Sequence, residues 1–268
     1  GGYGHAIALT DHGECLSWGD NDYGQLGHGT VERSLRPKSI ERLSRDFIIK
    51  TACGFRHTIF MTKNGRLFAC GSSENGRLGL NDETEKRMLP ALIEKLENVE
   101  IGDIACGSDY NLALSKDGSF IWSWGKGEYG KLGHKTERKD EKEPKMIEEL
   151  CGIGIDSVYC CNNASFALLK NGRIMSWGQA RLTGHESGPN GGEKIALVPN
   201  LYNIISMACG NEHILAINSD GRVFGWGNNT DFQLGLESST WVKNPTKIDS
   251  PLTMKPNHRI SQVACGRN

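Results

Sequence analysis

The amino-acid sequence predicts an all-β protein of the β-propeller class, built from five repeats. Three observations carry this prediction: a recurring glycine, a recurring turn, and short apolar runs on both sides of each turn. The glycine recurs every 49 to 56 residues, at Gly2, Gly54, Gly107, Gly210 and Gly266, with Cys161 in its place in the fourth copy. A period near 50 residues is typical of stacked supersecondary units such as propeller blades.

The repeats delimit a single propeller domain or fragment over residues 1–268. Their approximate bounds are 2–53, 54–106, 107–160, 161–209 and 210–265. One blade cannot bury both of its faces, so neighbouring blades must cover it, and a closed ring removes the exposed ends.

A glycine-containing dipeptide in each repeat predicts a tight β-hairpin. The dipeptides are His12-Gly13, Asn64-Gly65, Asp117-Gly118, Asn171-Gly172 and Asp220-Gly221. Asn-Gly and Asp-Gly favour a two-residue type I′ turn, because both residues tolerate positive φ. Apolar and β-branched runs such as Thr58–Met61 and Leu67–Cys70 flank the turns and predict short strands.

Two further strands are expected in each repeat. A third strand should end in each Ala-Cys-Gly sequence, for example over Ile260–Gly266. A weaker fourth segment carries a proline, which belongs on an edge strand because no ladder donor is lost there. These prolines are Pro37, Pro90, Pro144, Pro199 and Pro245. Antiparallel strands with no helix between the repeats describe propeller blades.

The overall composition excludes several classes of function. Lys and Arg number 31 against 32 Asp and Glu, so the net charge is −1, and nucleic acid is not expected as the main partner. No window of about 18 apolar residues predicts a membrane span. The sequence contains neither a Cys-x-x-Cys pair nor a phosphate-binding loop, so neither a metal nor a cofactor is predicted.

Five of the nine cysteines share one position of the repeat. Equivalent atoms of adjacent blades are too far apart for a disulfide, so free thiols are expected. We interpret these side chains as small buried hydrophobic groups in a reducing compartment, the cytoplasm or the nucleus. They are Cys53, Cys106, Cys160, Cys209 and Cys265.

The repeat motifs resemble those of the regulator of chromosome condensation family. The resemblance rests on Ala52–His57, on the turn Asn64-Gly65 and on Gly24–Gly27, and it covers essentially the whole chain. That family usually closes a ring of seven blades, so the resemblance implies that this chain is part of a seven-bladed propeller. The alternative is a closed five-bladed ring, in which Gly4–Leu9 continues the pattern after Gly266.

Histidine recurs three residues after the repeat glycine, at His5, His57 and His213. A repeated histidine is predicted to be structural, with its ring bonded to a backbone group that fixes the loop into the next strand. The repeat glycines Gly2, Gly54, Gly107 and Gly210 are assigned the same structural role. No serine or cysteine nucleophile is paired with the histidines in sequence, so no catalytic residue and no enzyme activity are predicted.

Two segments depart from the repeat. Lys135–Glu143 carries eight charges in nine residues and is predicted to be a solvated loop, with a docking loop as the alternative. The fourth repeat replaces glycine by Cys161 and histidine by Ala164, and a Gly-rich excursion follows over Glu186–Glu193. Departures from a local rule concentrate at strained or functional sites. The alternative is that this blade tolerates sequence change.

We therefore expect a non-enzymatic interaction scaffold, a module of a larger protein, that presents loops of one propeller face to a protein partner. The founding member of the family that the repeats resemble binds the small GTPase Ran and releases its nucleotide. Exchange on a Ran-type GTPase is therefore the alternative, followed by chromatin binding. The predicted contact residues follow the repeat glycines: Tyr3, Phe55, Arg56, Ser108, Asp109, Asn162, Asn163, Asn211 and Glu212.

Overall fold

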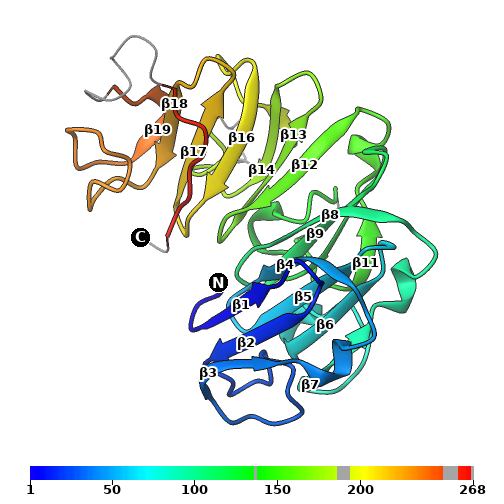
Figure 1. Cartoon of the computed structure of the whole chain (residues 1–268). Helices are drawn as coiled ribbons and strands as arrows, with labels where there is room; N and C mark the ends of the chain where they lie inside the picture. The colour runs from blue at the N-terminus through cyan, green and yellow to red at the C-terminus, as the bar shows by residue number, and fades with distance from the viewer. Residues whose placement is uncertain (136–137, 186–193, 250–258, 267–268) are drawn as a thin grey trace. The chain divides into compact units, whose positions relative to one another are not determined.

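The structure, a computed structural model, describes residues 1–135, 138–185, 194–249 and 259–266. Within these residues the strands form five antiparallel sheets, each ordered as the strands follow in sequence (Figure 1). The all-β propeller class is thereby confirmed. The chain divides into two compact units, Gly1–Glu128 with His134–Ile153 and Tyr129–Gly133 with Gly154–Asn268.

The first unit holds three sheets. The first sheet consists of β1 (His5–Leu9), β2 (Cys15–Gly19) and β3 (Ser34–Ser39). The second consists of β4 (Ile48–Cys53), β5 (His57–Thr62), β6 (Leu67–Ser72) and β7 (Lys86–Leu92). The third consists of β8 (Ile101–Cys106), β9 (Tyr110–Ser115), β10 (Ile121–Gly125) and β11 (Glu141–Met146).

The second unit holds two sheets. One consists of β12 (Ile155–Cys160), β13 (Ala164–Leu169), β14 (Ile174–Gly178) and β15 (Ala196–Leu197). The other consists of β16 (Ile204–Cys209), β17 (His213–Asn218), β18 (Val223–Gly227) and β19 (Val242–Lys247).

Short 3-10 helices interrupt the loops of the described chain. They are η1 (Glu41–Leu43), η2 (Glu74–Gly76), η3 (Glu94–Leu96), η4 (Glu128–Gly130) and η5 (Glu148–Leu150). None of the helices in the described residues has the length and apolar composition needed to cross a membrane. The excursion Glu186–Glu193 and residues Thr136 and Glu137 of the charged run lie outside the described residues.

The sequence repeat and the sheet are offset from one another. Residues 54–106 supply β5, β6 and β7 to one sheet, and their last strand, β8, pairs with β9 of the next sheet. Each repeat in this part of the chain therefore joins two sheets, because it provides the first strand on which its successor is built.

The hairpin turns differ from the predicted type. Thr62 N–H donates to the carbonyl oxygen of Arg66 at 3.0 Å, so three residues separate the paired positions. Gly65 has a φ of 80°, whereas Asn64 is not among the residues with positive φ. The prediction of a two-residue type I′ turn is therefore wrong. The arrangement is a type I turn closed by a left-handed glycine, as in three-residue hairpins.

The hairpin of the third sheet is one residue longer than the others. Ser115 N–H donates to the carbonyl oxygen of Phe120 at 2.8 Å, which leaves four residues in the loop. Asp117 Oδ1 accepts hydrogen bonds from Ser115 Oγ at 2.6 Å and from Ser119 N–H at 3.0 Å. Phe120 consequently takes the pairing position that a charged residue holds in the other hairpins, namely Glu14, Arg66, Arg173 and Arg222.

Two strand predictions need correction. Pro37, Pro90, Pro144 and Pro245 lie in the outer strands β3, β7, β11 and β19 as predicted, but Pro199 follows β15 instead of lying in it. Residues 260–266 carry no assigned strand, although the segment runs beside β17 (Figure 1). In the four-stranded sheets the strand that ends in the repeat cysteine pairs with the hairpin that follows it, as β4 pairs with β5.

In the third and fifth sheets a buried tryptophan bonds the turn that precedes the sheet. Trp124 Nε1–H donates to the carbonyl oxygen of Arg77 at 3.2 Å, and Trp226 Nε1–H donates to that of Leu182 at 2.8 Å. Both indole rings are fully buried. The fourth repeat thus keeps this contact even though its Gly-x-Leu-Gly sequence has changed.

Gly2, Gly54 and Gly210 each leave room for the histidine ring three residues later. A methyl group built on Gly54 would collide with Cε1 of His57, and one on Gly210 would collide with the ring of His213. In the fourth repeat both members of the pair change together. Ala164 removes the ring, and the buried Cys161 side chain stands where the other repeats have only hydrogen.

All nine cysteines carry free thiols. The five repeat cysteines are partly buried, less completely than Cys15, Cys70 and Cys161. We expect a thiol reagent to titrate all nine cysteines after denaturation without reductant. A yield several thiols short of nine would show disulfides and contradict a reducing compartment.

Candidate protein-interaction surface

The loops after the repeat glycines are tied to one another by backbone hydrogen bonds. Phe55 N–H donates to the carbonyl oxygen of Ser108 at 2.8 Å in the first unit. In the second unit Asn162 N–H donates to the carbonyl oxygen of Asn211 at 3.2 Å. Because each loop is held at both ends by strands, the predicted contact residues occupy fixed positions within their own unit.

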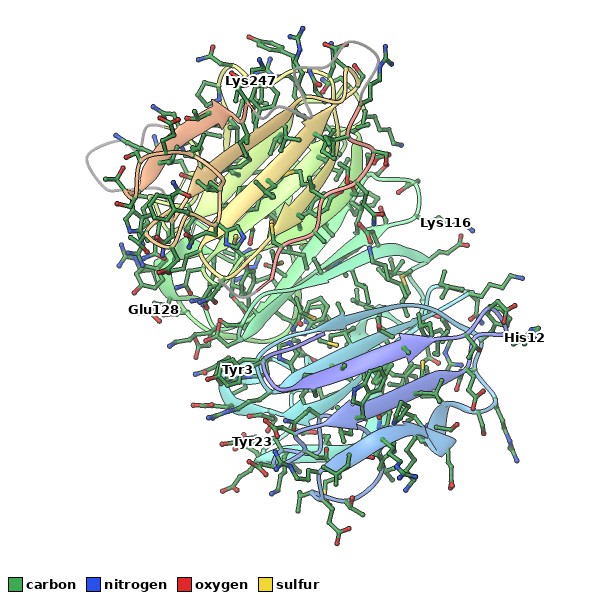
Figure 2. The ribbon with its side chains drawn as sticks, turned by 60° about the vertical axis from the view of Figure 1, so that its left-hand side comes forward. Tyr3, His12, Tyr23, Lys116, Glu128 and Lys247 are labelled. Carbon is green, nitrogen blue, oxygen red and sulfur yellow. The ribbon has the colours of Figure 1, made fainter. Side chains whose placement is uncertain are left out.

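Aromatic and cationic side chains form a stack in the first unit. The rings of Tyr3 and Phe55 lie 4.0 Å apart between centroids, at an interplanar angle of 32°. The Arg56 guanidinium lies 4.5 Å from the ring centroid of Tyr23 and 5.2 Å from that of Phe55. Tyr3 is 49% exposed, and Figure 2 places Tyr3 and Tyr23 at the same end of the strands. These four side chains are called the aromatic-cation stack below.

A cleft of about 580 Å³ adjoins the stack. Tyr23 and Arg56 form part of its wall, and residues 72–85 form most of the remainder, together with Asp140 and Lys142. Its carboxylates are largely engaged in ion pairs. The pairs are Glu74 with Arg77 at 3.0 Å, Asp82 with Arg87 at 2.6 Å, and Glu83 with Lys142 at 3.5 Å.

Ser108 and Asp109 are half-buried in the loop that Phe55 bonds, and their side chains are hydrogen-bonded to each other. Ser108 Oγ donates to Asp109 Oδ1 at 3.0 Å. Burial lowers the pKa of the Arg77 guanidinium, and the carboxylates of Asp109 and Glu74 oppose that change. Asp109 therefore helps to keep a nearly buried cation charged.

The predicted residues of the second unit form their own contacts. Asn163 Oδ1 accepts a hydrogen bond at 3.0 Å from Nζ of Lys131, which is fully buried. Glu212 pairs with Arg181 at 2.7 Å, and the Arg181 guanidinium lies 4.3 Å from the ring centroid of Trp241. Asn163 and Glu212 thus each have a fixed polar partner.

Sequence reasoning missed Tyr23, which completes the stack. Tyr23 immediately precedes the Gly-x-Leu-Gly turn Gly24–Gly27, one of the motifs on which the family resemblance rests. Tyr129 occupies the corresponding place before Gly130-Lys131-Leu132-Gly133. An aromatic side chain recurring before this turn is a sequence signal that could have identified the position.

Two of the repeat histidines, His5 and His57, bond side chains of the next sheet, not the backbone groups that were predicted. His5 Nε2–H donates to Thr58 Oγ1 at 3.0 Å, and His57 Nε2–H donates to Asn111 Oδ1 at 2.7 Å. Burial lowers the pKa of His5 to about 4 and that of His57 to about 3. Both rings are therefore neutral at pH 7. Across the described ranges, no group of three His, Cys, Asp or Glu side chains could hold a metal ion.

Solved structures with the same fold include human WBSCR16 and yeast Prp20p. WBSCR16 superposes with a TM-score of 0.83 at 25% identity, over 99% of this chain and 68% of that structure. Prp20p from Saccharomyces cerevisiae, a protein studied for its binding to Gsp1p and histones, superposes with a TM-score of 0.83 at 23% identity. That superposition covers 98% of this chain and 65% of Prp20p.

The human E3 ubiquitin-protein ligase HERC2 is 34% identical over 268 residues, which cover 98% of this chain and only 5% of HERC2. The profile described as "Regulator of chromosome condensation (RCC1) repeat" matches residues 12–61, 64–114, 119–168 and 220–268. Within the described residues these matches include strands of all five sheets. The chain therefore belongs to the regulator of chromosome condensation repeat family.

Proposed function

We propose that this chain is a protein-interaction module of a larger protein and that the aromatic-cation stack contacts the partner. The observation that carries the proposal is an arginine held between two aromatic rings at the edge of a cleft of about 580 Å³. The chain covers only a small share of HERC2, which supports the hypothesis that it is one module of a larger protein. The shares of WBSCR16 and Prp20p that it covers support a place within a larger propeller.

The stack has the properties of an interface anchor. Tyr and Arg are enriched among the residues that dominate binding energy, particularly where they become fully buried against a partner. Arg56 is already oriented by Tyr23 and Phe55, so less side-chain freedom is lost when a partner orders it. The adjoining cleft offers a concave surface for a partner side chain.

Replacing Phe55 and Arg56 together by alanine should weaken partner binding by about 2 kcal/mol or more, roughly a 30-fold rise in Kd. The melting temperature should change little, because both side chains are only partly buried. Proteins retained by the immobilised chain and by the double variant are compared by quantitative mass spectrometry, and Kd is then measured by calorimetry. Leu35→Ala, at an 86% exposed position, is the control.

Two outcomes would count against the proposed surface. Equal retention of every protein by the chain and the double variant would remove the stack from the interface. If the double variant has both a lower melting temperature and weaker binding, Phe55 packs between sheets and does not contact a partner.

Exchange on a Ran-type GTPase is the second candidate, and the fold shared with Prp20p is the observation that favours it. The assay follows release of a fluorescent guanine nucleotide from such a GTPase in the presence of the chain. Acceleration that disappears with Phe55→Ala and Arg56→Ala would replace the scaffold proposal by exchange. An unchanged release rate would exclude exchange by this chain.

A further inference from the structure

A second hollow in the first unit lies at the other end of the strands from the aromatic-cation stack. Figure 2 shows Lys116 on the edge opposite Tyr3 and Tyr23. The hollow has a volume of about 510 Å³, within the range of ligand-binding clefts. We call it the third-hairpin groove, and its lining residues are Asn98, Val99, Glu100, Ser115, Lys116, Asp117, Phe120, Trp122 and Met146.

The floor of the groove is apolar and partly open to solvent. Phe120 is 43% exposed and Met146 is 38% exposed. The rings of Phe120 and Trp122 lie 6.2 Å apart between centroids, and Val99 completes the apolar lining. Exposed apolar clusters of this kind mark binding sites, because apolar surface gains free energy when it is removed from water.

Folding does not explain why Phe120 is aromatic. The corresponding position of the other hairpins holds a charged residue, and those hairpins form with the same flanking pairs. The extra residue of the third hairpin brings Phe120 into this position and so builds one wall of the groove. The groove is therefore a feature of this hairpin and not of the repeat.

The charged rim of the groove carries two carboxylates and one ammonium group. Lys116 pairs with Glu100, so these two charges offset one another locally. Hydrogen bonds from Ser115 and Ser119 hold the pKa of Asp117 at about 2, so its carboxylate is ionised at neutral pH. Among the lining residues the carboxylates outnumber the ammonium group by one, which favours a positively charged ligand.

We propose that the third-hairpin groove binds a linear segment of a partner protein in which an apolar anchor side chain is followed closely by a basic residue. The anchor packs against Phe120, Trp122 and Met146, and the basic side chain reaches the carboxylate of Asp117. This site is separate from the aromatic-cation stack, and its test does not depend on the partner bound there.

Selection of a phage-displayed library of random 12-residue peptides against the whole chain tests the proposal. Enriched peptides should share an apolar residue within about three positions of Arg or Lys, as the charge of the rim requires. Binding of a selected peptide should change the fluorescence of the partly exposed Trp122. Phe120→Arg, which installs the residue found at Arg66, should weaken that binding at least tenfold.

Matched variants separate the groove from general effects. Leu35→Ala, an exposed apolar position elsewhere in the unit, should leave the peptide affinity unchanged. Asp117→Asn should lower the affinity and reduce its salt dependence. If Phe120→Arg alters the circular dichroism spectrum, the peptide affinity is measured with Phe120→Ser instead. This variant removes the ring without adding a charge and should also weaken binding.

Several results would overturn the proposal. These are a library that enriches no peptide, enriched peptides that carry Asp or Glu beside the anchor, and peptides that bind Phe120→Arg as tightly as the native chain. Concentration-dependent dimerisation that Phe120→Arg abolishes would show that a second copy of the chain fills the groove instead.

Discussion

Replacing Gly54 by cysteine should destabilise the first unit by about 1–3 kcal/mol, because the new side chain collides with the His57 ring and also lies close to the carbonyl oxygen of Gly107. His57→Ala alone should cost about 2–4 kcal/mol, since it leaves a cavity and removes the hydrogen bond to Asn111. Together the two changes should cost less than their sum by about 1–3 kcal/mol. The reason is that Cys161 and Ala164 already show this combination folded.

Urea unfolding of the four proteins, followed by circular dichroism, gives the coupling free energy. His12→Ala, at a side chain that is 90% exposed, is the matched control and should show no coupling to Gly54→Cys. Strict additivity of Gly54→Cys and His57→Ala would contradict the steric origin of the glycine.

Acid should weaken the first unit between about pH 6.5 and pH 4. Burial lowers the pKa of His57 to about 3 and that of His5 to about 4, so both rings stay neutral in the fold. In the unfolded chain they take up protons near pH 6.5. Below that pH the unfolded state binds more protons than the folded state. The free energy of unfolding is therefore highest above pH 6.5 and falls by several kcal/mol as the pH drops toward 4.

The measurement is the free energy of unfolding in urea at a series of pH values from 7.5 to 5. His57→Gln removes one of the two buried rings and should reduce the pH slope by up to one proton. His12→Gln removes an exposed ring and should leave the slope unchanged. Equal slopes for the native chain and His57→Gln would show that His57 is not held neutral by burial.

The recurring motif was enough to predict the all-β class and the propeller blades, because apolar strands around a glycine turn dictate antiparallel hairpins. The turn type was not predictable from Asn64-Gly65 alone. It depends on which residues pair across the loop, and the Thr62 to Arg66 hydrogen bond sets three residues between them. The predicted edge strand at Pro199 was wrong because β15 ends at Leu197, two residues before the proline.

The candidate surface was partly predictable. Repetition pointed to the loops of Tyr3, Phe55 and Arg56, and the first unit brings these side chains together. Tyr23 was missed because it comes from a different loop, and only the three-dimensional packing places it under the Arg56 guanidinium. The third-hairpin groove was missed because its origin is a single added residue, which becomes visible only in the register of β9 with β10.

The offset between repeat and sheet bears on how such an array can gain or lose members. A copy of residues 54–106 brings a hairpin for the sheet already begun and the opening strand for the sheet to come. Tandem duplication or excision at this phase therefore leaves every ladder closed, wherever along the array the recombination occurs. A duplication in phase with the sheet, from β4 to β7, adds a sheet that is complete in itself, whereas a copy of residues 54–106 takes the first strand of its sheet from the repeat before it. A repeat of this phase therefore needs the repeats on both sides of it before each of its strands belongs to a complete sheet.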